Sequence, residues 1–135
     1  MVTARRRSGQ LIFTNATIAG IKTSIIIDTG GELSIGNKAL QKRLRLKSSA
    51  MTQMNLVDVT GRSVPADYGI AEELLIGRAR FGIIPIAFAD IAPFKALRLD
   101  KTPAMFLGMD ALRKFDRVAI DFANRKIYFL IPEEA

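Results

Sequence analysis

Short runs of apolar residues, many of them β-branched, alternate along this 135-residue chain with small and polar residues that favour turns. Such runs are typical of β-strands joined by tight turns into hairpins. We predict four hairpins, whose strands cover residues 11–18 with 21–27, 54–59 with 63–70, 74–76 with 81–88, and 118–122 with 126–131. The run Ile25-Ile26-Ile27 is apolar at every position, so we expect its strand to be buried on both faces.

Two segments favour helix over strand. The first begins after Asn37, a plausible N-cap, and places Leu40 and Leu44 one turn apart. The second is a short helix over residues 110–115, with Asp110 expected as its N-cap. The whole pattern predicts a mainly β protein with one or two short helices.

The remaining segments complete the predicted organisation. Residues 89–103 carry two prolines and are expected to form a loop. Pro85 lacks a backbone N–H, which places the strand over residues 81–88 toward the edge of a sheet. A chain of this length suggests one domain. We expect that domain to span residues 10–132, after a basic tail at residues 1–9.

The composition excludes several kinds of chemistry, because the chain has no histidine and no cysteine. A Ser-His-Asp triad, a Cys-His pair, a disulfide framework and a zinc site built from His or Cys are all impossible. Acid–base chemistry would have to use Asp, Glu, Lys or Tyr side chains, or a Ser–Lys pair. No serine or lysine stands in a recognisable nucleophile setting, so a Ser–Lys hydrolase ranks last. We expect neither a metal nor a cofactor.

The chain is strongly basic, with 20 Lys and Arg against 13 Asp and Glu, a net charge of +7. Such a balance suits a nucleic-acid partner. However, the basic residues of segment 38–47 are interleaved with leucines, which favours the solvated face of an amphipathic helix and its exit. Aromatic residues for base stacking are scarce, with no Trp and two Tyr. We therefore expect no nucleic-acid partner, and a basic nucleic-acid-binding β domain remains an alternative based on charge alone.

No stretch of about 20 largely apolar residues is present, so we expect no membrane span. The chain as given is expected to be soluble, and cytoplasmic if it is complete.

A carboxylate follows the apolar strand directly, in the triplet Asp28-Thr29-Gly30. The end of a buried strand is an unfavourable place for a charge unless it has partners or a function. A tight turn in which Asp28 bonds its own backbone is the simpler interpretation. A second element adds weight to the functional one, because Phe106-Leu107-Gly108 precedes the short helix and the closing hairpin.

With these two elements in order, the sequence resembles the retropepsin-like aspartic proteases, in particular their bacterial branch. The resemblance runs from about Leu11 to Ile131. It implies a closed, β-barrel-like lobe, one half of a two-lobed protease. Asp28 then matches the catalytic aspartate. Thr29 matches the residue whose hydroxyl crosslinks the two active-site loops, and Gly30 matches the glycine that shapes the loop.

The resemblance also assigns supporting and substrate-binding roles. Phe106, Leu107 and Gly108 match the apolar pair and glycine that pack under the catalytic loop. The hairpin over residues 56–66 lies where the family has its flap, although an ordinary surface hairpin is an equal alternative. The expected flap and substrate-binding residues are Val59, Thr60, Gly61 and Arg62.

Two positions depart from the family pattern. Gly31 stands where Ala or Ser is common, and we expect it to loosen the loop. Retroviral members usually have an acidic residue next and an Arg directly after the C-terminal glycine, which form a supporting ion pair. Glu32 could supply the acid here, but Met109 replaces the Arg. This support must then come from elsewhere in the chain.

The resemblance implies an aspartic endopeptidase that acts on polypeptides. Its mechanism needs two carboxyl groups that share one proton, and this chain has one Asp-Thr-Gly and no Asp-Ser-Gly. We therefore predict a homodimer in which each subunit contributes Asp28. The alternative is a non-catalytic retropepsin-like module that dimerises a larger protein or binds peptides.

Overall fold

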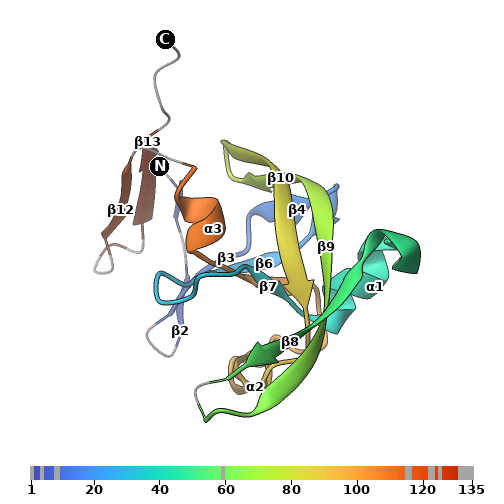
Figure 1. Cartoon of the computed structure of the whole chain (residues 1–135). Helices are drawn as coiled ribbons and strands as arrows, with labels where there is room; N and C mark the ends of the chain where they lie inside the picture. Colours follow the sequence, from blue (N-terminus) through green and yellow to red (C-terminus); the bar gives the residue numbers. More distant parts are fainter. Residues whose placement is uncertain are drawn as a thin grey trace.

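The structure is a computed structural model that describes residues 2–3, 5–7, 10–58, 60–114, 117–121, 124 and 126–130. The chain is mainly β, as predicted, and its principal sheet curls into a half-barrel (Figure 1). The strands of this sheet are β2 (Arg5–Arg7), β3 (Gln10–Phe13), β4 (Ala16–Ile18), β5 (Ile21–Lys22), β6 (Ser24–Ile27), β7 (Ile35–Gly36), β8 (Thr52–Val57), β9 (Ser63–Ile76), β10 (Ala79–Phe88) and β11 (Ala104–Leu107).

The other elements are fewer and shorter. A second sheet of order β1-β13-β12 contains β1 (Val2–Thr3), β12 (Arg117–Asp121) and β13 (Lys126–Leu130). The helices are α1 (Lys38–Leu44), α2 (Ala92–Ala96), α3 (Met109–Leu112) and the 3₁₀ helix η1 (Ser48–Ala50). None of the described helices is long and apolar enough to cross a membrane.

The predicted hairpins are present. Strand β4 pairs with β5, β8 with β9, β9 with β10, and β12 with β13, each in antiparallel register. The turn between β4 and β5 is formed by Ala19 and Gly20, both with positive φ, as expected for the tight turns that join antiparallel strands. The predicted strands 63–70 and 74–76 are one continuous strand, β9, and its pairing with β10 shifts register around Gly82.

The strand order is β2-β3-β6-β11-β7-β10-β9-β4-β5, with β8 added on β9. Strand β10 therefore lies inside the sheet, and the expectation that Pro85 marks an edge strand is wrong. The physical reason is that β7 pairs only with Ala87 and Phe88 of β10. Pro85 pairs with Ile70 of β9, so its missing N–H costs no bond to a second neighbour.

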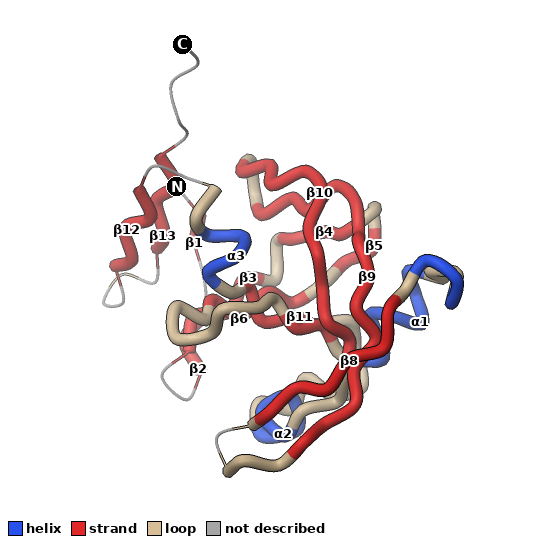
Figure 2. The backbone as a smooth tube through the Cα atoms, in the orientation of Figure 1, coloured by secondary structure: helices blue, strands red, loops and turns tan. Residues whose placement is uncertain are grey.

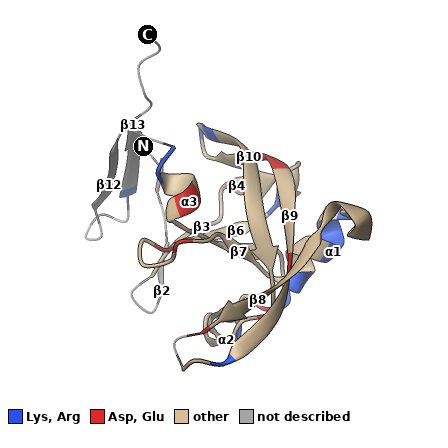
Figure 3. Ribbon diagram, viewed as in Figure 1, with Lys and Arg blue, Asp and Glu red and all other residues tan. Residues whose placement is uncertain are grey.

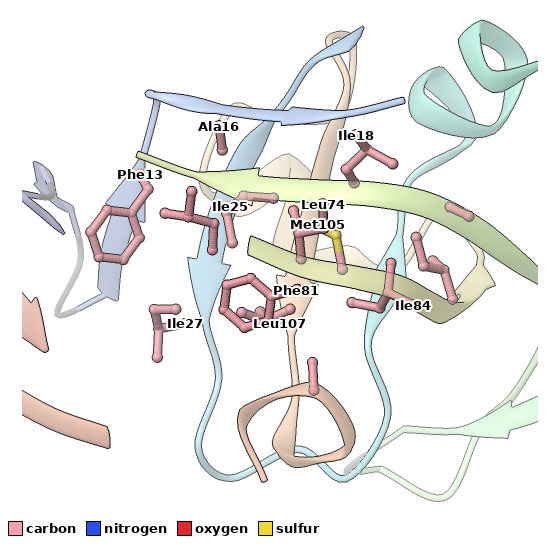
Figure 4. Close-up of a cluster of buried hydrophobic side chains, with 14 of the residues drawn as sticks. Phe13, Ala16, Ile18, Ile25, Ile27, Leu74, Phe81, Ile84, Met105 and Leu107 are labelled. Atoms are coloured by element: carbon pink, nitrogen blue, oxygen red, sulfur yellow. The ribbon is translucent and has the colours of Figure 1, made fainter. Parts of the chain in front are cut away.

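Strand β6 lies at the centre of the fold and is buried on both faces, as the Ile25-Ile26-Ile27 run predicts. Ile25 and Ile27 point into the main hydrophobic cluster inside the curled sheet (Figure 4). Ile26 points the other way, into a second cluster with Phe94 and Phe106, whose rings lie 4.9 Å apart. Burial of apolar surface on both faces holds β6 in place. The position of Asp28, which directly follows this strand, is therefore well defined.

Residues 89–103 are not all loop, because α2 occupies Ala92–Ala96. Phe94 and Leu97 are buried in the second cluster, and Pro93 lies in the first turn of the helix, where its missing N–H costs no intrahelical bond. The helix has five residues, so its apolar positions are too few for the periodicity to have predicted it.

Helix α1 follows the prediction closely. The side chain of Asn37 caps it by accepting a hydrogen bond from the N–H of Leu40 at 2.9 Å. Asn37 is fully buried and also binds the loop before β11, by donating to the carbonyls of Leu99 and Thr102. Figure 3 shows blue Lys and Arg positions along α1. Four basic side chains of the segment are exposed: Lys42, Arg43, Arg45 and Lys47.

The segment predicted as a basic tail contributes two strands. Residues Arg5–Arg7 form β2, which pairs with β3, and residues Val2–Thr3 form β1, which pairs with β13. Figure 1 shows the β1-β13-β12 sheet near both ends of the chain.

Candidate active site

Asp28 lies where two parallel strands end together. Strands β6 and β11 pair from Ser24 opposite Ala104 to Ile27 opposite Leu107. The pairing continues for one bond, because the N–H of Asp28 donates to the carbonyl of Leu107 at 3.0 Å. The loop over residues 28–34 then crosses beside α3 (Figure 2). The side chain of Asp28 is half-buried, whereas Thr29 and Gly30 are exposed. The paired strands β6 and β11 therefore hold the Asp28 carboxylate at a partly exposed position.

Gly31 approaches this carboxylate closely. A Cβ atom on Gly31 would lie 2.5 Å from Oδ2 of Asp28, far inside van der Waals contact. The loop is also bonded at this point, because the carbonyl of Gly31 accepts from the N–H of Met109 at 2.8 Å. A side chain at this position would require the Asp28 carboxylate to shift, and the expectation that Gly31 loosens the loop stays a prediction.

Gly108 makes an even closer approach to the same loop. A Cβ atom there would lie 2.4 Å from the carbonyl oxygen of Leu33 and 3.0 Å from that of Gly31. Both are backbone atoms, which move only with the loop itself. The glycine is therefore required by the packing of the turn after β11 against the loop that carries Asp28.

The apolar pair before Gly108 anchors this turn on both sides of the sheet. Leu107 is fully buried in the main cluster, and Phe106 is buried in the second cluster against Phe94. Because successive residues of a strand point to opposite faces, two adjacent apolar residues fix the strand from both sides. The structure thus brings Phe106, Leu107 and Gly108 together with the loop of Asp28.

Asp110 joins the two segments by side-chain bonds and was not predicted in this role. Its carboxylate accepts from the hydroxyl of Ser34 at 2.6 Å and from the N–H of Ser34 at 3.2 Å. The Ser34 hydroxyl in turn accepts from the N–H of Gly108 at 3.1 Å. The expectation that Asp110 is the N-cap of the helix is wrong, because Gly108 occupies that position. Asp110 lies in the first turn and reaches across to the loop instead.

Glu32 also has a partner that sequence reasoning did not find. Its carboxylate forms a two-pronged ion pair with the guanidinium of Arg113, with Nη2 and Oε2 2.8 Å apart. The hydrogen bond from Arg113 lowers the pKa of Glu32 below its ordinary value. Arg113 lies four residues after Met109, one helical turn further on. The i, i+4 spacing was therefore the signal that could have identified it.

The hairpin of β8 and β9 carries the predicted flap residues Thr60, Gly61 and Arg62, while Val59 lies outside the described residues. Thr60, Gly61 and Arg62 are all exposed. The turn is organised by Asp58, which sequence reasoning missed. An Asp two residues before a Thr at a glycine turn is a known turn former, and that pattern was available in the sequence. Within the described residues, the bonds of the turn stay inside the hairpin and do not join it to Asp28.

The comparisons with known proteins agree with this geometry. A sequence model of the family described as aspartyl protease matches residues 14–111, well over half of the chain. The chain therefore belongs to the aspartyl protease family. No curated protein sequence matches the chain.

Two solved structures have the same fold. The first is a retropepsin-like aspartic protease from Rickettsia conorii, with a TM-score of 0.63 and 20% identity over 90% of this chain and 83% of that one. The second is the retroviral protease-like domain of Ddi1 from Leishmania major, with a TM-score of 0.56 and 19% identity over 96% of this chain and 90% of that one. The protein thus has the retropepsin-like fold of the aspartic proteases.

Proposed function

We propose that this protein is an aspartic endopeptidase that acts as a homodimer, with Asp28 of each subunit forming the catalytic dyad. The observation that carries the proposal is the setting of Asp28. It is a half-buried carboxylate that follows three buried isoleucines of one strand, inside the region matched by the aspartyl protease family. The loop around it is closed by backbone bonds to Leu107 and Met109, so the backbone that carries the carboxylate has a fixed place.

Two such carboxyl groups supply the chemistry of peptide hydrolysis. When they lie a few ångströms apart, they cannot both ionise, and the pair holds one shared proton. The ionised member takes a proton from a water molecule, which attacks the scissile carbonyl carbon. The protonated member donates a hydrogen bond to the carbonyl oxygen and stabilises its developing charge.

The dimer follows from the number of these carboxylates. One chain supplies a single Asp-Thr-Gly, so the second carboxylate comes from a second copy. A two-fold axis beside the loop would bring Asp28 to Asp28 of the partner subunit, because a two-fold interface places the same surface of each subunit together. Thr29 and Gly30 are exposed beside Asp28 and would form the contact between the two loops.

Polypeptide substrates would bind in an extended conformation across the dimer. The β8–β9 hairpin serves as the flap, with Val59, Thr60, Gly61 and Arg62 as its substrate-binding residues. Backbone hydrogen bonds to an added strand give affinity in this mode, and side-chain pockets give specificity. The catalytic loop is supported, and Asp28 is kept in position, by four residues: Gly31, Phe106, Leu107 and Gly108.

The direct test is proteolysis of an unfolded protein, such as reduced casein, by the purified chain and by Asp28→Asn. We expect the parent to cleave between about pH 3 and pH 7, and Asp28→Asn to lose at least about a thousandfold in rate. Asp100→Asn is the matched control, since Asp100 is also half-buried but lies in the loop before β11. Equal cleavage by the parent and Asp28→Asn would overturn the proposal, and peptide binding without cleavage would favour a non-catalytic module.

A further inference from the structure

The turn at the end of the β8–β9 hairpin is built around one side chain, that of Asp58. Its Oδ1 atom accepts three hydrogen bonds: from the N–H of Thr60 at 2.9 Å, from the Thr60 hydroxyl at 2.6 Å and from the N–H of Arg62 at 2.9 Å. Its backbone carbonyl accepts from the N–H of Gly61 at 3.0 Å. Its own N–H donates to the carbonyl of Arg62 at 2.9 Å.

The turn is held by these hydrogen bonds and not by packing against other elements. Asp58, Thr60, Gly61 and Arg62 are all exposed. A Cβ atom built on Gly61 would meet nothing within 4 Å, so no neighbouring element supports the turn there. Gly61 has φ of +83°, a conformation that costs a glycine little and that lets the chain reverse. Bonds to an ionised acceptor are shorter and stronger than bonds between neutral groups.

The ionised form of Asp58 is the one that these donors favour. The hydrogen bond from the Thr60 hydroxyl, followed by that from the Arg62 N–H, lowers the pKa of Asp58 below its ordinary value. Arg62 is the charged side chain that acts on it, and its positive charge works in the same direction. The carboxylate is therefore the acceptor around which the turn closes at neutral pH.

The turn also carries the most exposed large apolar side chain among the described residues. Val57, the last residue of β8, is 74% exposed and pairs with Ser63, the first residue of β9. An apolar side chain on an otherwise polar turn gains free energy when a ligand covers it. Val57 directly precedes Asp58, so it lies beside the turn that Asp58 holds.

We propose that Asp58 is the positioning residue of the flap: its carboxylate holds the tip of the hairpin in a preformed shape that presents Val57 and the backbone of residues 60–62 to the substrate. This inference rests on the proposed function of the hairpin as a flap. A preformed tip binds substrate more tightly than a mobile one, because no conformational entropy has to be lost to order it on binding. Asp58 touches neither the dyad nor the scissile bond in this account, so its loss weakens binding and leaves the chemical step unchanged.

The test compares Asp58→Ala with Asp58→Asn, which keeps an acceptor oxygen in the same place. Steady-state kinetics on a peptide that the parent cleaves should show KM raised about two- to tenfold in Asp58→Ala with kcat preserved. Asp58→Asn should restore most of the loss in KM. Glu72→Gln, an exposed carboxylate elsewhere on β9, is the control and should behave as the parent.

Amide hydrogen exchange of the uncomplexed protein provides a readout that does not need activity. We expect the N–H groups of Thr60 and Arg62 to exchange faster in Asp58→Ala and to stay protected in the parent and in Asp58→Asn. Unchanged KM and unchanged exchange in Asp58→Ala, with activity intact, would overturn this inference alone. Absence of peptidase activity in the parent would overturn the proposed function, and with it the role of this hairpin as a flap.

Discussion

The guanidinium of Arg113 pairs with the carboxylate of Glu32, and this contact ties the end of α3 to the loop that carries Asp28. The two residues are 81 positions apart in the chain. Together with the bonds from Met109 to Gly31 and from Asp110 to Glu32, the pair closes one side of the loop. The resemblance led us to look for an Arg directly after Gly108, and the Arg that pairs with Glu32 instead lies one helical turn further on.

We expect Arg113→Ala to lower peptidase activity modestly, by about two- to fivefold, because both partners are exposed and water screens their attraction. Kinetics of Glu32→Ala, Arg113→Ala and the double variant would measure the coupling between them. The losses should not add, since either single change removes the same contact. Full additivity would show that the pair does not support the loop.

The Ser34–Asp110 contact should matter more for stability. The side chain of Ser34 is buried, and Asp110→Ala leaves its hydroxyl and N–H without their acceptor. Unsatisfied buried groups cost about 1–3 kcal/mol, so the free energy of unfolding in urea should fall by about that amount. Asp110→Asn keeps one acceptor oxygen and should lose less. Equal losses in the two variants would argue against the hydrogen bonds as the cause.

Gly108→Ala should be among the most damaging small changes in the chain. The added Cβ would meet the backbone of Leu33 at 2.4 Å, which cannot yield without moving the loop of Asp28. We expect a loss of about 3 kcal/mol in the free energy of unfolding, and impaired activity in the folded fraction. Gly30→Ala is the control for stability, since its Cβ would lie at an ordinary 3.7 Å from Asp28. A Gly108→Ala protein as stable as Gly30→Ala would show that the close approach is wrong.

The stability of the fold should depend on pH through Asp67, at the base of the β8–β9 hairpin. Hydrogen bonds from Gln41 and from Lys38 lower its pKa in the folded protein. A carboxyl group whose pKa is lower when folded stabilises the protein above its unfolded pKa, and this contribution is lost as pH falls through the folded pKa. The stability difference between the parent and Asp67→Asn should therefore shrink as pH falls from about 6 to about 3. A difference that stays constant over this range would contradict the assignment.

The sequence predicted the strands well where apolar runs were long and turns were marked by glycine. It located Asp28 because the Ile25-Ile26-Ile27 run requires a buried strand and the Asp-Thr-Gly triplet ends it. It also predicted Asn37 as a cap, since an N-cap acts on residues a few positions away. These features are local, and local patterns are visible in a sequence.

The features that the sequence did not predict depend on contacts between segments that are distant in the chain. The partners of Glu32 and Ser34 lie 81 and 76 residues away, and the pairing of β11 with both β6 and β7 brings them together. The close approach of Gly31 to the Asp28 side chain is likewise a matter of space, which no pattern of residue types reveals. Helix α2 was missed for a different reason, because five residues give too little periodicity to separate a helix from a loop.

The central claim, that two copies of Asp28 form one active site, is tested most directly by mixing subunits. Parent and Asp28→Asn chains are refolded together in equal amounts, and peptidase activity is measured at constant total protein. If every active site needs Asp28 from both subunits, one dimer in four is active, and activity should fall to about a quarter of that of the parent. A fall to about one half would mean that each chain works alone, and would contradict the account.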